Sequence, residues 1–98
     1  MSKVRSPGTV FEAIVARVLR GAGVSTTARR AEAAAASGGG AYLEKVRAHA
    51  YKITDEDVAA LKRAGMDEET IFELTIAAAV GVAERRLARA MEVIDAAE

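Results

Sequence analysis

The sequence predicts an all-α protein, a single bundle of about five helices that ends in one long helix. Of its 98 residues, 23 are Ala, the strongest helix former, and only one is Pro. Apolar residues recur every three or four positions, which is the period of an amphipathic helix. Glycines and other turn-forming residues gather between these periodic segments. Hydrophobic residues make up 51% of the chain, which is enough for one folded domain over residues 1–98.

The first two helices are expected within the first 36 residues. The first follows a turn signal at residues 6–8 and runs from about Val10 to Arg20, with an apolar stripe along one face. The second is capped by one of residues 25–27 and runs to Ala36. Because its apolar side chains are alanines, this second helix must lie in a groove that admits only methyl groups, or fray.

Two further helices are expected after a glycine-rich connector. The third covers residues 41–52, with its apolar side chains on one face. Thr54 is a good N-cap for the fourth, and Asp57 lies at the capping-box position three residues later. Gly65 ends the fourth helix, since glycine readily takes the left-handed conformation of a C-terminal cap.

The last helix is expected from about Glu68 to Ala96, behind an Asp67 cap. Glu73 is the only charged side chain between positions 70 and 83, so this part of the helix is apolar almost all round. A helix of that kind is normally buried on most sides. The rest of a 98-residue chain offers too few large side chains to cover it. We therefore expect a homo-oligomer.

The expected interface involves the same long helix. Its small residues Ala77, Ala78, Ala79 and Gly81 allow close helix approach. Beyond the charged region, a narrow apolar seam continues with Leu87, Met91 and Ile94. On this interpretation, Ala78→Arg would break the oligomer or aggregate the protein. Charge is also divided along the chain, with a net +6 in residues 1–53 and −6 in residues 54–98. That division has two interpretations, acidic capping of helix N-termini and charge-complementary self-association.

Composition excludes several classes of function. The net charge is zero, which argues against a general nucleic-acid binder, because such a protein needs an excess of basic side chains. The chain has no Cys and one His, so we expect no disulfide, no metal site and no cofactor. The longest uncharged apolar run, residues 76–83, is far shorter than the roughly 20 residues of a membrane span. With no secretory signal pattern at the start, the expectation is a cytoplasmic protein without a membrane partner.

The stretch from Thr54 to Leu87 resembles the second half of the alkylhydroperoxidase D-like / carboxymuconolactone decarboxylase family. The elements that carry the resemblance are Ala64-Gly65, then the acidic cap Asp67-Glu68-Glu69, then Ile71-Phe72-Glu73, then the Ala-rich part Ala77-Ala78-Ala79-Val80-Gly81. With the preceding helix, the match covers roughly residues 42–91. Residues 41–98 thus look like the family core, and residues 1–40 match weakly. The resemblance implies an all-α fold assembled as dimers, trimers or hexamers.

The chain departs from the family at the redox site. The peroxidase branch of the family carries two cysteines and a histidine on the helix that ends at Ala-Gly. Counted back from Gly65, those positions fall on Ala50, Ile53 and Asp57. Disulfide exchange needs two thiols, so thiol peroxidase chemistry is excluded for this chain.

Five side chains are the candidate site residues. His49 and Glu73 are candidate catalytic residues, because an imidazole titrates near neutral pH and a carboxylate in an apolar helix needs a partner. We expect Arg29, Arg30, Arg47 or His49 as that partner. A surface histidine and a structural ion pair are the plain alternatives. Candidate ligand-binding residues are Tyr42, Tyr51 and Arg47; Arg85, Arg86 and Arg89 can bind an anion or form ion pairs.

Three functions remain open from the sequence. The first is an oligomeric helical protein that binds a small ligand without catalysis. The second is a lyase or isomerase of the carboxymuconolactone decarboxylase type that acts on a small organic acid through His49 and Glu73. The third is a helical docking module for another protein. Convergence of His49 and Glu73 on one enclosed cavity of the oligomer would favour the second.

Overall fold

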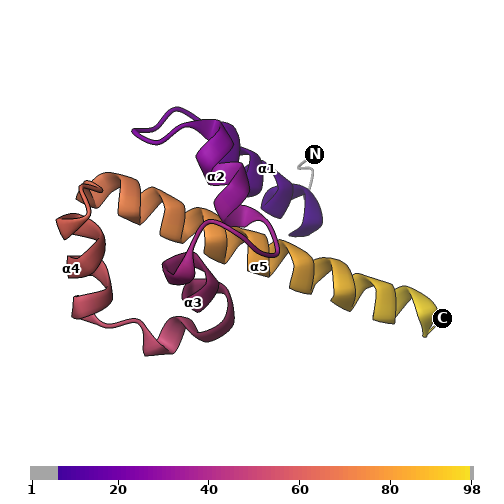
Figure 1. Ribbon diagram of the computed structural model, residues 1–98. Helices are drawn as coiled ribbons and strands as arrows, with labels where there is room; N and C mark the ends of the chain where they lie inside the picture. The colour runs from indigo at the N-terminus through magenta and orange to yellow at the C-terminus, as the bar shows by residue number, and fades with distance from the viewer. Residues whose placement is uncertain (1–6, 98) are drawn as a thin grey trace.

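A computed structural model describes residues 7–97 of the chain, and over that range it is all-helical, with no strand (Figure 1). The helices are α1 (Pro7–Arg20), α2 (Thr27–Ala34), α3 (Ala41–His49), α4 (Asp55–Arg63) and α5 (Glu68–Ala96), with a short 3-10 helix, η1 (Ala50–Lys52), after α3. The predicted bundle of five helices with a long C-terminal helix is confirmed. Within the described range, no helix is both long and apolar enough to cross a membrane.

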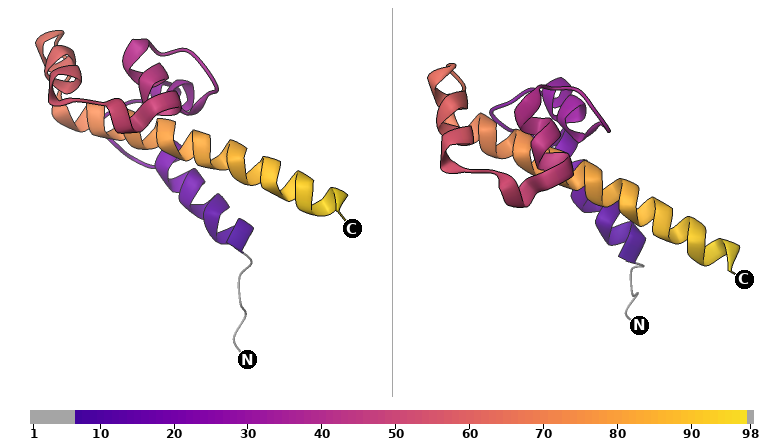
Figure 2. Two further views of the ribbon diagram at one scale, coloured as in Figure 1. Left: turned by 90° about the horizontal axis from the view of Figure 1, so that it is seen from below. Right: turned by 60° about the horizontal axis from the view of Figure 1, so that its bottom comes forward.

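The long helix α5 is the axis of the molecule. Figures 1 and 2 show the other four helices gathered around its N-terminal and middle parts, with α4 near its start and α1 on a different side from α3. The C-terminal part of α5 projects beyond them. The fold is accordingly elongated, with extents of 51 × 30 × 21 Å.

The core is centred on the contact between α2 and α5, and it is built from small side chains. Ala33 of α2 and Ala77 and Ala78 of α5 have no exposed surface, and Leu43 and Leu74 beside them retain only 5%. Gly81 lies so close to the end of α2 that a Cβ there would overlap the Ala34 carbonyl. Of the two outcomes expected for the second helix, Ala33 and Ala34 show the groove for methyl groups rather than fraying, and Arg30 of the same helix is buried as well.

This packing corrects the role assigned to Ala78. Its methyl group is covered by the chain itself, within the same cluster as Ala33. Ala78→Arg would therefore separate α2 from α5, and it would not report on self-association. The small residues of α5 do permit close helix approach, but for Ala77, Ala78 and Gly81 the approaching helix belongs to the same chain.

The helix ends follow local capping rules. Thr54 and Asp57 form the predicted capping box: the Thr54 N–H donates to Asp57 Oδ2 at 2.8 Å, and the Asp57 N–H donates to Thr54 Oγ1 at 3.2 Å. The bond from Lys45 Nζ, at 2.7 Å, together with the Thr54 N–H holds the pKa of Asp57 below its ordinary value. Asp67 caps α5 as predicted, through the Thr70 N–H at 2.7 Å.

Three boundaries differ from the prediction. Helix α1 begins at Pro7, within the expected turn at residues 6–8, instead of at about Val10. Helix α2 ends at Ala34 instead of Ala36, and the predicted helix over residues 41–52 is interrupted after His49. His49 has φ −147° and ψ 55°, which is not helical, and the chain continues as η1. The reason for the early end of α2 lies in the side chains that meet it, described below.

Candidate functional site

Glu73 holds the segment that leads into α2. Its Oε2 accepts a hydrogen bond from the Val24 N–H at 2.8 Å, and its Oε1 accepts bonds from the Ser25 N–H at 2.8 Å and the Ser25 hydroxyl at 2.5 Å. These three donors stabilise the ionised carboxylate. The Ser25 hydroxyl and the two backbone N–H groups lower the pKa of Glu73 to about 2.

These partners are not the ones expected from the sequence. We expected a cationic side chain beside Glu73, whereas the structure places backbone N–H groups and a hydroxyl there. Arg30 acts on the carboxylate only through its nearby charge. Gly23 completes the contact, because a Cβ at that position would lie 2.9–3.0 Å from the Glu73 carboxylate. In this geometry Glu73 positions the α2 segment, and with its pKa near 2 it stays ionised at neutral pH.

Glu73 should make folding sensitive to acid. Its pKa is about 2 in the folded chain against an ordinary value of 4.5, so its stabilising effect is complete above about pH 4.5 and is lost as the pH falls toward 2. Glu73→Gln should therefore lower Tm at pH 7 and reduce the fall in Tm between pH 5 and 2. Thermal unfolding followed by circular dichroism measures both effects.

The matched control is Glu69→Gln, one turn earlier on α5, where the carboxylate is exposed. This variant should leave the dependence of Tm on pH nearly unchanged. Equal pH profiles for wild type and Glu73→Gln would show that the hydrogen bonds to residues 24 and 25 do not hold the loop.

The other candidate catalytic residue lies apart from Glu73. His49 is exposed at the end of α3, where its ring meets the edge of Tyr51 with centroids 5.9 Å apart. Tyr51 itself is 80% exposed. The two cavities that Glu73 lines are completed by residues of α1, α2 and α5, and His49 is not among them. Within one chain, the structure does not bring His49 and Glu73 together.

Tyr42 lies at a third place. Its hydroxyl is 2.8 Å from Thr75 Oγ1, which in turn donates to the Ile71 carbonyl at 2.7 Å. The ring borders a small cavity of about 50 Å³ between α2, α3, α4 and α5, whose lining includes Arg29 and Glu32. A space of that size holds one or two water molecules at most. The predicted ligand-binding residues Tyr42, Tyr51 and Arg47 therefore do not form one pocket.

Arg47 lines a larger opening, which we call the arginine cleft. It is an open cleft of about 460 Å³ between α3, the end of α2 and the middle of α5. Its lining consists of Ala36, Glu44, Arg47, Ala48, Val82, Arg85, Arg86 and Arg89. Four guanidinium groups thus face one cleft whose own lining has a single carboxylate, Glu44.

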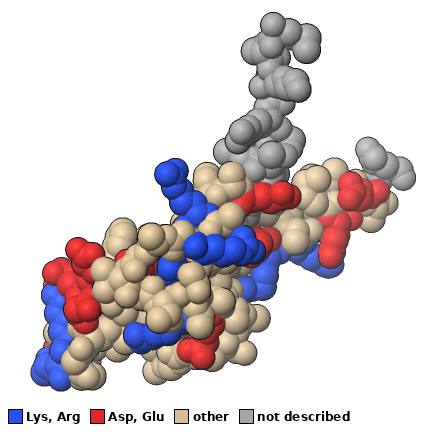
Figure 3. All heavy atoms as spheres, turned by 90° about the horizontal axis from the view of Figure 1, so that it is seen from above, with Lys and Arg blue, Asp and Glu red and all other residues tan. Residues whose placement is uncertain are grey.

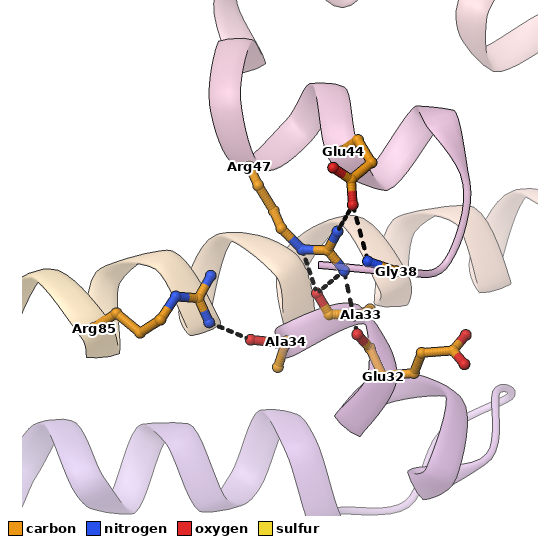
Figure 4. Close-up of polar contacts among 7 residues, drawn as sticks. All are labelled: Glu32, Ala33, Ala34, Gly38, Glu44, Arg47 and Arg85. Carbon is orange, nitrogen blue, oxygen red and sulfur yellow. Dashed lines mark hydrogen bonds and ion pairs between the residues drawn. The ribbon is translucent and has the colours of Figure 1, made fainter. Parts of the chain in front are cut away.

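Two of these arginines build the cleft by ending α2 (Figure 4). Arg47 donates to the Ala33 carbonyl at 3.0 Å and to the Glu32 carbonyl at 3.2 Å, and it pairs with Glu44 Oε1 at 2.9 Å. Arg85 donates to the Ala34 carbonyl at 2.6 Å. The last carbonyls of a helix lack partners within the helix and favour a nearby positive charge. These contacts explain why α2 stops at Ala34.

The chain can reach this arrangement because of its glycines. Gly38, Gly39 and Gly40 all have positive φ, between 82° and 98°, a region that other residues rarely adopt. They turn the chain sharply from α2 into α3, which brings Arg47 back onto the α2 carbonyls. The other two arginines, Arg86 and Arg89, also line the cleft and are exposed. Arg89 pairs with Glu92 at 3.2 Å.

All four arginines are candidate residues in the sequence, but the sequence does not indicate that they meet in one cleft. From the sequence, Arg47 is a candidate ligand-binding residue, and an anion site or ion pairs are expected at Arg85, Arg86 and Arg89. The missing information was the path of the connector, which has no signature in side-chain spacing. Among residues 7–97, no three His, Asp or Glu side chains are grouped so as to hold a metal ion.

A second surface feature runs along α5 opposite the face that carries its buried residues, and we call it the α5 stripe. It consists of Phe72, Ile76, Ala79, Ala83, Leu87, Ala90 and Ile94, all exposed in the single chain. Its first two large residues, Phe72 and Ile76, also border a cavity that Arg17 and Arg30 line. Phe72 is 65% exposed and Ile94 55%. On the face of Figure 3, basic and acidic side chains are interspersed around a broad uncharged area. The division of charge along the sequence therefore does not produce a face of one sign in that view.

Comparison with protein-family models, curated proteins and solved structures finds no match for the chain.

Proposed function

We propose that the chain is a subunit of a homo-oligomer, an alkylhydroperoxidase D-like helical protein without thiol peroxidase activity. The observation that carries the proposal is the α5 stripe, an exposed apolar face on a helix whose opposite face is buried as far as Gly81. Burying a large aliphatic or aromatic side chain contributes about 1.5–3 kcal/mol. Phe72, Leu87 and Ile94 retain much of their surface, so a partner helix would gain much of this.

The interior of the single chain supports the same conclusion. Among residues 12–97, whose side chains the structure describes, the core residues without any exposed surface are three alanines, and the larger core side chains each keep about 5%. Helix α4 has no buried residue at all, and its apolar side chains Val58 and Leu61 are half-buried. A domain with so little large buried side-chain volume gains stability by associating with another surface.

Ala83→Arg tests this proposal, because Ala83 is at the centre of the α5 stripe. The added guanidinium would lie in the interface and should convert the oligomer into a monomer at micromolar concentration. Sedimentation velocity of wild type and variant measures the change, and circular dichroism checks that the helices are retained.

The control is Ala88→Arg, on the same helix but on the side away from the stripe, where the residue is also exposed. It should sediment like the wild type. A wild type that is monomeric at 100 micromolar would contradict the proposal. An Ala83→Arg variant with unchanged sedimentation would do the same.

The arginine cleft supports a second candidate function, the binding of a small anion such as a carboxylate or phosphate. Guanidinium groups bind both through charge-assisted hydrogen bonds. Arg86 and Arg89 line the cleft and are exposed, whereas Arg47 and Arg85 donate to the last carbonyls of α2. On this basis the small ligand would be an anion, a class that includes small organic acids.

Titration with acetate and, separately, inorganic phosphate tests the cleft and tells the two anions apart. Chemical shifts of the arginine Nε–H groups report where the anion binds. The double variant Arg86→Gln/Arg89→Gln should weaken binding about tenfold or more, because a charged hydrogen bond is worth roughly 1.5–3 kcal/mol. The control Lys62→Gln/Arg63→Gln removes the same charge from α4. Equal weakening in both variants would indicate nonspecific screening and contradict the site.

The lyase or isomerase alternative requires two arrangements that the single chain does not have. His49 and Glu73 would have to meet across a subunit interface, and Glu73 would have to release the Val24 and Ser25 N–H groups before it could take a proton. The proposal therefore applies to the assembled oligomer. A structure of the oligomer with His49 and Glu73 on one enclosed cavity would support it.

A further inference from the structure

The spacing of the α5 stripe is the same in both chain directions. From Phe72 to Ile94 the steps between stripe residues are 4, 3, 4, 4, 3 and 4 positions, with Ala83 at the centre. The mean step is about 3.7 residues, close to one helical turn, so the stripe stays on one side of a straight helix. It is about 33 Å long at the usual rise per residue.

Large and small side chains follow one another along the stripe so that, in an antiparallel pair, a large residue of one copy faces a small residue of the other at several levels. When two copies of α5 lie antiparallel with Ala83 beside its counterpart, Ile76 faces Ala90 and Leu87 faces Ala79. Phe72 and Ile94 face each other at both ends. A parallel pair would instead set Leu87 against Leu87 and Ala79 against Ala79, which crowds one level and leaves a gap at another. Alternation of large and small residues across facing helices is the arrangement that packs well.

On this basis we infer that the occupant of the α5 stripe is a second copy of this chain, paired antiparallel about a two-fold axis beside Ala83. The inference rests on the proposed homo-oligomer and specifies its register. A two-fold interface uses the same patch on both subunits, so the patch must be complementary to itself. The α5 stripe meets that requirement in its spacing, and in side-chain size at the Ile76/Ala90 and Leu87/Ala79 levels.

Two other features of the fold agree with this register. The C-terminal part of α5 projects beyond the other helices (Figure 2), and an antiparallel partner would cover it with its own N-terminal half. Ala83 at the crossing point allows the helix axes to approach to about 8 Å, the lower end of the usual range. The antiparallel helix dipoles also attract each other.

The lack of cysteine provides a clean test. Ala83→Cys introduces a single thiol at the two-fold axis, and mild oxidation should give a disulfide-linked dimer on non-reducing gels, because the two Cβ atoms would be near the 3.5–4.5 Å that a disulfide requires. An equimolar mixture of Ala79→Cys and Leu87→Cys, one of them carrying a size tag, should give the mixed dimer. Each of these two variants alone should stay uncrosslinked, since its thiols would lie about 12 Å apart along the helix.

The outcomes separate the register from the proposed homo-oligomer. Crosslinking of Ala79→Cys and of Leu87→Cys each with itself, without the mixed product, would mean a parallel pair and overturn the inference while self-association stands. An oligomer in which none of the three variants crosslinks would place the interface elsewhere, which overturns it too. A wild type that sediments as a monomer would overturn both proposals. Circular dichroism of each variant confirms that it is folded before oxidation.

Discussion

Gly81→Val is expected to unfold the chain or leave it only marginally stable. A side chain at Gly81 would overlap the backbone of Ala34, with its Cβ 2.7–2.8 Å from the Ala34 carbonyl carbon and Cα. Backbone cannot rotate away as the end of a flexible side chain can, so α2 would have to leave α5. Forced overpacking costs roughly 1–3 kcal/mol, and loss of the α2 contact would add to that. Urea unfolding followed by circular dichroism measures the loss.

The control for Gly81→Val is Ala88→Val, two turns later on nearly the same side of α5 but exposed. It should cost no more than about 0.7 kcal/mol, the intrinsic helix preference of Ala over Val. The intermediate variant Gly81→Ala should also destabilise, even though Ala is about 1 kcal/mol the better helix former. A stability gain for Gly81→Ala would contradict the close approach of α2 and α5.

The second large effect is expected for Arg30→Ala. Arg30 is only 4% exposed, and its guanidinium donates to the Val18 carbonyl at 2.9 Å and to the Ser25 carbonyl at 3.4 Å. It thereby joins the end of α1 to the start of α2. Truncation leaves both carbonyls without that donor and opens space where the side chain was. Each buried group left without a partner costs about 1–3 kcal/mol, so we expect a loss of about 2–4 kcal/mol in unfolding free energy.

The neighbouring residue provides the control. Arg29→Ala removes the same side chain from an exposed position of α2 and should change stability by less than about 0.5 kcal/mol. Arg30→Lys should recover only part of the loss, because a single ammonium cannot reach both carbonyls in the geometry of the guanidinium fork. Similar unfolding free energies for Arg29→Ala and Arg30→Ala would show that Arg30 does not link α1 with α2.

The parts of the fold that were predicted correctly depend on neighbours in sequence. The Thr54 and Asp57 capping box and the Asp67 cap are set within three residues, so the pattern alone indicates them. For α2, burial of alanine methyl groups in a narrow groove was one of two predictable outcomes, fraying being the other, while the burial of Arg30 was not indicated. The end of α2 was not, since Arg47 and Arg85 reach it from 14 and 51 positions away.

The candidate site shows the same limit. Glu73 was correctly singled out as a carboxylate that needs partners, but the partners are N–H groups that every residue carries, so no side-chain pattern could indicate Val24 and Ser25. Arg30 was considered only as a partner for Glu73. Its contacts with two carbonyls depend on the tertiary position of α1, and that position cannot be inferred from the spacing of residues in the sequence.

The way α2 is held at both ends has a consequence for the order of folding. Glu73 holds the start of α2, and Arg47 and Arg85 hold its end. Glu73 lies 48 positions from Ser25 in the sequence, and Arg85 lies 51 positions from Ala34. An eight-residue helix does not persist in water by itself. We therefore expect α5 and α3 to form early from contacts between neighbours in sequence, and α2 to pack against α5 last. Closure of this loop of about 50 residues, rather than helix formation, would then limit the folding rate.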